Sequence, residues 1–399
     1  MSELQTHSFE AGRRGKPDEL DAGIAHLIGA YFLEQNSLSR FDLRVSGGFL
    51  QELDQLIVRV SGEISESLFS RSHLRADISR LIVEHYNQVH RTTFPESHFR
   101  LEYEFKKQSD GLAANNNAGD SGNPIAVAYR TSPIHFPWER YLAVEIRNLF
   151  DTIFQSDGTV PAFLADHSGI SVLSGLRADG KIGVDASYDR VAVHGVDQVT
   201  LALEHEPSLT IEELRVKAET LVRSYLHFLE KQYDVNFNNP TICVNGLGAW
   251  HQGGWKVDEG SREAKSYRDG FSSYGVVEDS FSGEDPSKPS ATGTFLARYI
   301  AVQVVANEFA DFARVALNYT IGREEVGLNI TTQDTASIPQ TELHQWVRRN
   351  IPLRISDTIE AFGLRSPQLY RDIVTASDFF HAEQFPWNKV IHQRSFSGS

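Results

Sequence analysis

The chain has a single cysteine, Cys243, among its 399 residues, and its one methionine is the first residue. One thiol excludes an internal disulfide framework and a metal cluster built from several thiolates of this chain. It also fits a reducing compartment, so we expect a cytoplasmic protein. Basic residues are scarce too, with 38 Lys and Arg against 53 Asp and Glu, a net charge of −15. This charge opposes nonspecific binding to nucleic acid and anionic lipid, and we expect neither partner.

Long hydrophobic runs are also missing. The most apolar long stretch covers residues 295–312 and is interrupted by Arg298, Asn307, Glu308 and Asp311. A helix that spans a bilayer needs about 20 mostly apolar residues. The start of the chain, MSELQTHSFEAGRRG, lacks the apolar core of a signal peptide. We therefore predict no segment in a membrane.

What is present is an ordinary globular composition, with 40% hydrophobic and 23% charged residues in 44.7 kDa. This length predicts two or three domains with a large core. In the first third, apolar residues at helical spacing follow Pro17, a residue that favours the first turn of a helix. A strand is predicted at 56–60, ending in Ser-Gly-Glu, and then a helix at 72–89 with Ser72 as its cap.

The rest of the chain alternates in the same way. Thr210 and Glu213 form a capping box before a helix that runs toward Glu230. The polar strand end at Glu204, His205 and Glu206 is interpreted as structural, since alternation separates the histidine from the carboxylates. Further elements are predicted from periodicity: helices at 138–154, 294–311, 341–349 and 355–362, and strands at 181–189, 191–203, 315–321 and 326–330.

These elements predict an α+β fold with three similar subdomains of mixed or antiparallel sheet covered by helices. The expected ranges are an N-terminal subdomain at 1–110, a central one at 111–238, a C-terminal one at 239–390 and a tail at 391–399. Residues 108–124, QSDGLAANNNAGDSGNP, are typical of a mobile loop and are the best candidate for a lid.

A first candidate site lies in the stretch GRRGKPDELDAG, residues 12–23. Lys16 stands at a helix start and can hold a phosphate as a point charge, although a solvated lysine explains it equally well. Asp18 is either a carboxylate that stabilises the helix dipole or a hard oxygen ligand for Mg²⁺. The residues alone leave both alternatives open.

Three segments together resemble S-adenosylmethionine synthetases. Residues 15–18, Gly-Lys-Pro-Asp, are similar to the family's Gly-His-Pro-Asp motif, and 117–122, Asn-Ala-Gly-Asp-Ser-Gly, to its Gly-Ala-Gly-Asp-Gln-Gly loop. Residues 281–288, Phe-Ser-Gly-Glu-Asp-Pro-Ser-Lys, are similar to its Phe-Ser-Gly-Lys-Asp-Pro-Ser-Lys loop. Weaker similarities at 61–64, 176–181, 239–241 and 385–387 keep the family's order and spacing.

The resemblance implies the family's three-subdomain fold and a homodimer, or a dimer of dimers, with active sites between subunits. It also implies the family's transferase reaction of S-adenosylmethionine biosynthesis and one-carbon metabolism. In that reaction the sulfur of L-methionine attacks C5′ of ATP, and the triphosphate that leaves is hydrolysed to phosphate and pyrophosphate. Mg²⁺ and K⁺ are the implied cofactors.

The resemblance also assigns roles by position. Lys16 takes the place of the family's catalytic histidine, and the roles implied for the matched residues fall into four groups. These are catalysis (Lys16, Asp120, Lys181 and Lys265), ATP binding (Lys16, Asp179, Lys181, Asp258 and Lys265), methionine binding (Glu63, Gln108, Asp258 and Lys288) and metal binding (Asp18, Asp42 and Asp285).

Several positions depart from the family pattern. Lysines of the family are replaced by Glu19 and Glu284, arginines by Ala264 and Cys243, and a magnesium aspartate by Ser290. Nearby candidates to restore positive charge are Arg13, Arg14, Arg262 and Arg268. Three hypotheses follow: a methionine adenosyltransferase, a related enzyme that uses S-adenosylmethionine, another nucleotide or another amino acid, and a noncatalytic nucleotide-binding or regulatory homologue.

Overall fold

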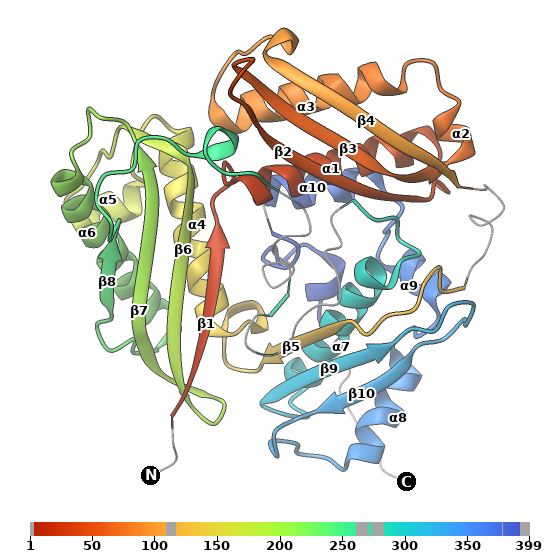
Figure 1. The fold of residues 1–399 in the computed structure, drawn as a ribbon. Coiled ribbons are helices and arrows are strands. Elements are labelled where there is room, and N and C mark those ends of the chain that lie inside the picture. The colour runs from red at the N-terminus through yellow and green to blue at the C-terminus, as the bar shows by residue number, and fades with distance from the viewer. Residues whose placement is uncertain are drawn as a thin grey trace.

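The computed structural model describes residues 4–108, 117–260, 270–271, 274, 283–376 and 378–391. Within them the strands form three separate sheets, each covered by helices on one face (Figure 1). The predicted α+β class with several helix-covered sheets is confirmed.

The first sheet has the order β2-β3-β4, with bounds β2 (Phe41–Leu50), β3 (Gln55–Ser65) and β4 (Phe99–Gln108). β2 and β3 are antiparallel, and β3 and β4 are parallel. Helices α1 (Pro17–Gln35) and α3 (Leu74–His90) pack their apolar residues against this sheet. The short helix α2 (Glu66–Phe69) follows β3 directly.

The second sheet has the order β1-β6-β7-β8, with bounds β1 (Gln5–Gly12), β6 (Leu176–Asp189), β7 (Ala192–His205) and β8 (Thr241–Val244). β1 joins this sheet by pairing antiparallel with β6, so the N-terminal strand lies beside a strand more than 160 residues away along the chain. The helices that belong to this part of the chain are α4 (Trp138–Gln155), α5 (Ala162–Ser168) and α6 (Ile211–Tyr233).

The third sheet has the order β10-β9-β5, with bounds β5 (Ile125–Tyr129), β9 (Phe312–Asn318) and β10 (Gly327–Thr331). Helix α7 (Thr294–Ala306) covers it, and Pro289–Gly293 forms a π-helical turn before α7. The last helices are α8 (Gln340–Asn350), α9 (Ile355–Ala361) and α10 (Pro367–Ala376). α10 packs along α1, so the end of the chain covers the first helix.

Most predicted helices are present with small shifts at their ends, and the Thr210 cap is confirmed because its hydroxyl accepts a hydrogen bond from Glu213 N at 3.2 Å. Three details were wrong. β3 does not end at Ser-Gly-Glu but continues to Ser65, and His73, not Ser72, is the N-cap of α3. Ile321 lies outside β9 and is 63% exposed.

The sheets do not follow the order of the sequence, since β1 belongs with β6 to β8 and β5 belongs with β9 and β10. The ranges 1–110, 111–238 and 239–390 therefore stay a prediction about how the chain divides. Residues 109–116 of the predicted lid and 392–399 of the tail lie outside the described residues.

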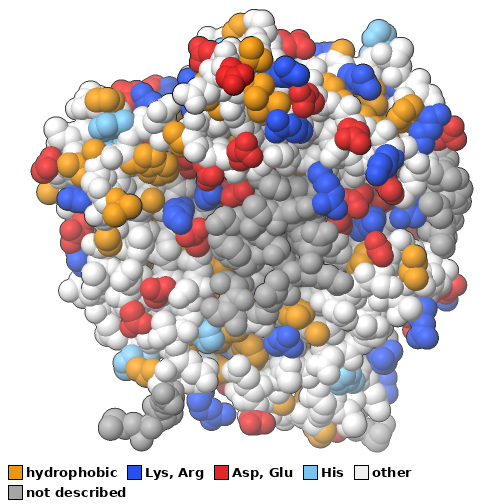
Figure 2. Space-filling model, viewed as in Figure 1, with side chains coloured by type: hydrophobic (Ala, Val, Ile, Leu, Met, Phe, Trp, Pro, Cys, Tyr) orange, Lys and Arg blue, Asp and Glu red, His pale blue; other side chains and the backbone are white. Residues whose placement is uncertain are grey.

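On the face of the molecule drawn in Figure 2, acidic and basic side chains are interspersed rather than gathered into one large patch of either sign. In the part of the chain that the structure describes, every helix is too short or too polar to cross a bilayer.

Candidate functional site

The first group of predicted site residues surrounds the N-terminus of α1. Pairing of β1 with β6 extends to Gly12 and Lys181, and two further backbone bonds hold the turn, from Arg13 N to Gly180 O at 2.8 Å and from Gly15 N to Ala178 O at 3.2 Å. A Cβ atom on Gly15 would lie 2.4 Å from Ala178 Cβ, so only glycine permits this approach. The approach brings Lys16 and Asp18 to the segment that carries Asp179 and Lys181.

Lys16 and Asp18 form an ion pair at the start of α1, with 2.8 Å between Nζ and Oδ2. Both side chains are largely buried. Lys181 projects from β6 and pairs with Glu10 of β1 at 2.9 Å, and its side chain is 46% exposed. Each of these lysines therefore already has a carboxylate neighbour, which lowers the positive charge it offers to a phosphate.

Asp179 is the most perturbed acid of this group. It is 4% exposed, and its carboxylate accepts hydrogen bonds from Gly254 N at 2.7 Å and Gly180 N at 2.6 Å. Glu204 lies beside it and accepts from Asp179 N at 3.2 Å and from Gly253 N at 2.9 Å. Burial, together with the negative charge of Glu204, raises the pKa of Asp179 to about 6. The group therefore ties the segment 251–254 to β6 and β7.

Because of this raised pKa, we expect the free energy of unfolding to depend on pH. Because the folded pKa of Asp179 exceeds its ordinary value of 3.8, its ionisation destabilises the folded state as the pH rises from about 4 to 7, by about 3 kcal/mol. Asp179→Asn cannot ionise and escapes this loss. We expect the free energy of unfolding of the wild type, measured in urea, to fall relative to the variant over that range. A difference that does not vary with pH would contradict the assignment.

Gly260, two residues after Asp258, packs against the start of α1. Gly260 N donates to Gly47 O at 2.9 Å, and a Cβ on Gly260 would lie 2.2 Å from Asp21 Oδ2. Asp258 itself is exposed. Lys265 and Ala264, as well as Arg262 and Arg268, lie outside the described residues.

The second group lies at one end of the β2-β3-β4 sheet. The antiparallel register pairs Asp42 with Glu63, and Gln108 ends β4 beside Ser65. The Gln108 amide donates to Glu63 Oε2 at 3.3 Å. The two residues implied to bind the amino acid are thus in contact, next to the residue implied to bind K⁺.

Lys288 completes this second group from a distant part of the chain. Its ammonium lies 3.4 Å from Asp42 Oδ2 and 3.2 Å from Asp120 Oδ2. Burial opposes its charge, but the carboxylates of Asp42, Glu284 and Asp120 outweigh burial and raise its pKa. Lys288 is therefore a protonated cation among carboxylates.

Asp285 has a different environment from the other implied metal residues. One of its oxygens accepts from the backbone N and hydroxyl of Ser287, and the other accepts from Phe41 N at 3.2 Å and lies 3.6 Å from Arg40 Nε. It is 1% exposed. These contacts favour a role in anchoring 284–288 to β2 over a role as a metal ligand. Gly119 packs against the same anchor, with its backbone N donating to Ser287 O at 3.1 Å.

Glu284 and Ser290, two of the departures from the family pattern, contact each other through a hydrogen bond from the Ser290 hydroxyl. Glu284 is 3% exposed and forms a β-bridge with Asp42. The second group thus holds four carboxylates and one lysine (Asp42, Glu63, Asp120, Glu284 and Lys288). Such a site repels a triphosphate and attracts a cation.

Neither described candidate arginine restores the lost charge here. Arg13 is fully buried, bonded to Asp151 at 2.8 Å and to the carbonyls of Arg177 and Asp179. Arg14 donates to Thr375 O and lies against a cavity at the other side of α1. Neither guanidinium is shown at the second group, and compensation of the lost charge by these arginines stays a prediction.

A cavity of about 840 Å³ adjoins the first group. Its lining includes Ala178 and Gly253, three basic residues and three acidic ones (Arg91, Arg177, Lys256, Asp157, Glu204 and Glu206). Arg91 pairs with Asp157, and Arg177 lies 3.7 Å from Glu204. Among the described residues, no group of three or more His, Cys, Asp or Glu side chains is arranged to hold a metal ion.

The two groups of site residues contact different parts of the fold. The described hydrogen bonds and ion pairs of the first group involve β1, β6 and β7. Those of the second group involve β2, β3 and the segment 284–290. Three contributing residues were missed from sequence: Glu10, Arg40 and the role of Glu204 beside Asp179. Period-two alternation can show which residues of a strand share a face, but it cannot show which strands pair.

Comparison with known proteins agrees with this architecture. A profile of the S-adenosylmethionine synthetase C-terminal domain matches residues 252–389. An S-adenosylmethionine synthase from Aquifex aeolicus (strain VF5) is 26% identical over 393 residues, which covers 96% of this chain and 95% of the relative. The fold is the α+β fold of three helix-covered sheets expected for these enzymes. Over nearly its whole length, the chain is thus similar to S-adenosylmethionine synthetases at low identity.

Proposed function

We propose that the protein is a methionine adenosyltransferase that forms S-adenosylmethionine from ATP and L-methionine and releases phosphate and pyrophosphate. The observation that carries this proposal is the sorting of the matched residues by role. Residues implied to bind the amino acid, Glu63, Gln108 and Lys288, share one end of one sheet. Residues implied to bind the nucleotide, Lys16, Asp179 and Lys181, surround the start of α1.

In this reaction the methionine sulfur forms a bond to C5′ of ATP while the bond from C5′ to the triphosphate oxygen breaks. The triphosphate leaves with the electron pair, and the product is a sulfonium cation. Glu63 and Gln108 hold the amino end of methionine, and Lys288 its carboxylate, so that the sulfur is oriented for attack. Lys16 and Lys181 stabilise the negative charge that develops on the leaving triphosphate.

The separation of the two groups supports a homodimer with sites shared between subunits. Lys181 and Glu63 both lie on exposed strand faces, away from the helices that cover each sheet. If such faces pack against a partner subunit, the nucleotide group of one subunit meets the amino-acid group of the other. We propose this arrangement, as a dimer or a dimer of dimers.

Metal use follows the family, whose members use Mg²⁺ and K⁺. Mg²⁺ is usually bound by one or two carboxylates together with substrate phosphates, so Asp18 alone is a sufficient protein ligand from the first group. Asp42 supplies an oxygen suited to K⁺ near the amino-acid residues. When bound, these cations neutralise part of the triphosphate charge.

A second candidate function is supported by the charge of the second group. Three carboxylates lie around Lys288, and Glu63 lies opposite one of them, Asp42. This excess of negative charge favours a cationic ligand, and S-adenosylmethionine carries a sulfonium charge. An enzyme that consumes S-adenosylmethionine, or one with another nucleotide or amino acid, fits this observation. A noncatalytic nucleotide-binding homologue is the third alternative.

The test is incubation of the full chain with ATP, L-methionine, Mg²⁺ and K⁺, followed by mass detection of the nucleoside product and assay of both phosphates. We expect S-adenosylmethionine, phosphate and pyrophosphate in equal amounts, with loss of product when either substrate is omitted. Absence of product together with tight binding of S-adenosylmethionine favours the second candidate. If neither ATP nor S-adenosylmethionine raises the melting temperature, the noncatalytic alternative becomes the better interpretation.

A further inference from the structure

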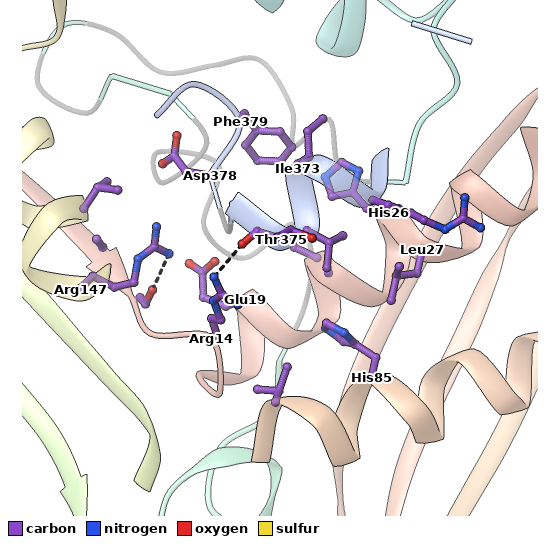
Figure 3. Close-up of a pocket in the computed structure, with 18 of the residues that line it drawn as sticks. Arg14, Glu19, His26, Leu27, His85, Arg147, Ile373, Thr375, Asp378 and Phe379 are labelled. Carbon is purple, nitrogen blue, oxygen red and sulfur yellow. Dashed lines mark hydrogen bonds between the residues drawn. The ribbon is translucent and has the colours of Figure 1, made fainter. Parts of the chain in front are cut away.

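A second cavity, of about 350 Å³, lies between α1, α3, α4 and α10 (Figure 3). Its lining residues on α1 include Glu19, Gly23 and His26, which the helical repeat places together on one face. Asp18 and Asp21 lie on a different face of the same helix, where Asp21 accepts a hydrogen bond from Gly47 N. The cavity is therefore separate from the candidate active site.

Two of the charges that line the cavity are neutralised by residues beside it. Asp378 accepts two hydrogen bonds from Arg140 Nη2, at 3.0 and 3.2 Å. Arg371 pairs with Glu34 at 2.5 Å. Because each is paired with an opposite charge, Asp378 and Arg371 add no net charge to the cavity.

The other charged side chains of the lining are Arg14, Arg147 and Glu19, which together carry one excess positive charge. Asp151 also lies near Arg14, but Arg13 already pairs with it at 2.8 Å. Arg147 donates to Gly12 O at 3.3 Å. Burial lowers the pKa of Arg14; the negative charge of Asp151 opposes this shift, and the repulsion from Arg147 adds to it. An anion between these two guanidiniums would relieve that repulsion.

Two side chains of the lining have unused hydrogen-bonding groups. Arg14 donates from Nη2 to Thr375 O at 2.7 Å, whereas its Nε is buried and has no partner among the described residues. His85 is 8% exposed, and no described residue forms a hydrogen bond with its imidazole. Burial lowers the pKa of His85 to about 4, so it is a neutral ring with one donor and one acceptor. Buried polar groups of this kind usually have a partner.

The remaining wall is apolar and suits the body of an organic molecule. Phe9, Val144, Ile373 and Phe379 line it, from β1, α4, α10 and the segment after α10. A volume of about 350 Å³ is in the range of sites for small metabolites and exceeds the needs of an inorganic ion. The lining thus combines an anion-binding corner with an apolar surface.

We propose that this cavity binds a small organic anion, with a carboxylate or phosphate head at Arg14, Arg147 and His85 and an apolar body against Phe9, Ile373 and Phe379. This proposal does not depend on the reaction assigned above. Because α1 carries both the cavity face and the residues Lys16 and Asp18, the ligand would contact the helix that forms the candidate active site.

The test uses calorimetric titration of the full chain with benzoate, phenyl phosphate and, as a neutral control of similar shape, benzyl alcohol. We expect at least one of the two anions to bind with a Kd below about 1 mM, and benzyl alcohol to bind much more weakly. Binding of one anion identifies a carboxylate or a phosphate head. Equal binding of benzyl alcohol, or binding of neither anion, would overturn the proposal.

Variants locate the site. Arg14→Gln should weaken anion binding by about tenfold or more, and Glu19→Gln should strengthen it by about threefold because a nearby negative charge is removed. The matched control is Arg91→Gln, an arginine of the larger cavity, which should leave the affinity unchanged. Glu19→Gln keeps the test valid if Arg14→Gln does not fold. Loss of binding in Lys16→Met, with Glu19→Gln unchanged, would place the anion at the candidate active site and refute the inference.

Discussion

Replacement of Lys288 by methionine is expected to lower kcat/KM for L-methionine by about a hundredfold or more, the usual cost of removing one preorganised charged group from an active site. The Lys288 ammonium lies within 3.4 Å of Asp42 and 3.2 Å of Asp120, and its side chain is only 15% exposed. Methionine keeps the length of the side chain but leaves these carboxylates without their cation. Steady-state kinetics at varied L-methionine concentration measure the effect.

Lys288→Arg and Lys107→Met are the comparison variants for this experiment. Arginine keeps the charge and should recover part of the activity, which a purely structural role would not require. Lys107 is a lysine at the end of β4 whose side chain is 52% exposed and pairs with Glu66 at 3.4 Å, so its loss should have little effect. A folded Lys288→Met protein that retains more than about half of the activity would exclude the proposed role.

Replacement of Arg140 by methionine is expected to destabilise the protein by about 3–5 kcal/mol, because it leaves Asp378 buried without its counter-charge. Arg140 is 1% exposed, lies 4.6 Å from the centre of the Phe136 ring and 4.9 Å from that of Phe9, and donates to Gly270 O at 3.3 Å. Burial alone would raise the pKa of Asp378, but Arg140 keeps it below its ordinary value. Unfolding in urea, followed by fluorescence, measures the loss.

A double-mutant cycle separates the energy of the Arg140–Asp378 ion pair from that of the surrounding packing contacts. Asp378→Asn combined with Arg140→Met should be more stable than the sum of the two single losses by about 1 kcal/mol or more, since no unpaired charge remains. The surface control is Arg80→Met, whose side chain is 65% exposed and pairs only with Asp77 three residues earlier. A loss in Arg80→Met as large as that in Arg140→Met would indicate that burial of the pair is not the cause.

Local periodicity was sufficient to predict most of the helices, because each helix has its own hydrophobic repeat and capping residues. The start of α1 at Pro17 and the Thr210 cap of α6 were predicted in this way. The partners of α1 were not predictable from the same signals. Its residues are buried on nearly all sides because α10, more than 300 residues later, packs along it, and no local pattern encodes that contact.

The contacts of the candidate site likewise include some that a local sequence pattern suggests and others that it does not. Asp42 and Glu63 face each other because β2 and β3 form a hairpin with a short connection, which a strand pattern can suggest. Lys288 reaches Asp42 only through the anchor of Asp285 on Phe41 N, across more than 240 residues of chain. The turn that buries Arg13 likewise depends on Gly15 packing against Ala178, a contact between the β1-α1 turn and β6.

The α+β class, the position of most helices and the resemblance to S-adenosylmethionine synthetases could all be predicted from sequence, because periodicity, caps and spaced motifs are properties of neighbouring residues. The contact between Glu284 and Ser290, the burial of Arg13 beside Asp151 and the charged cavity behind α1 were visible in the folded chain alone. These features arise where segments far apart in the chain pack together, and burial and charge at such contacts depend on all of the segments at once.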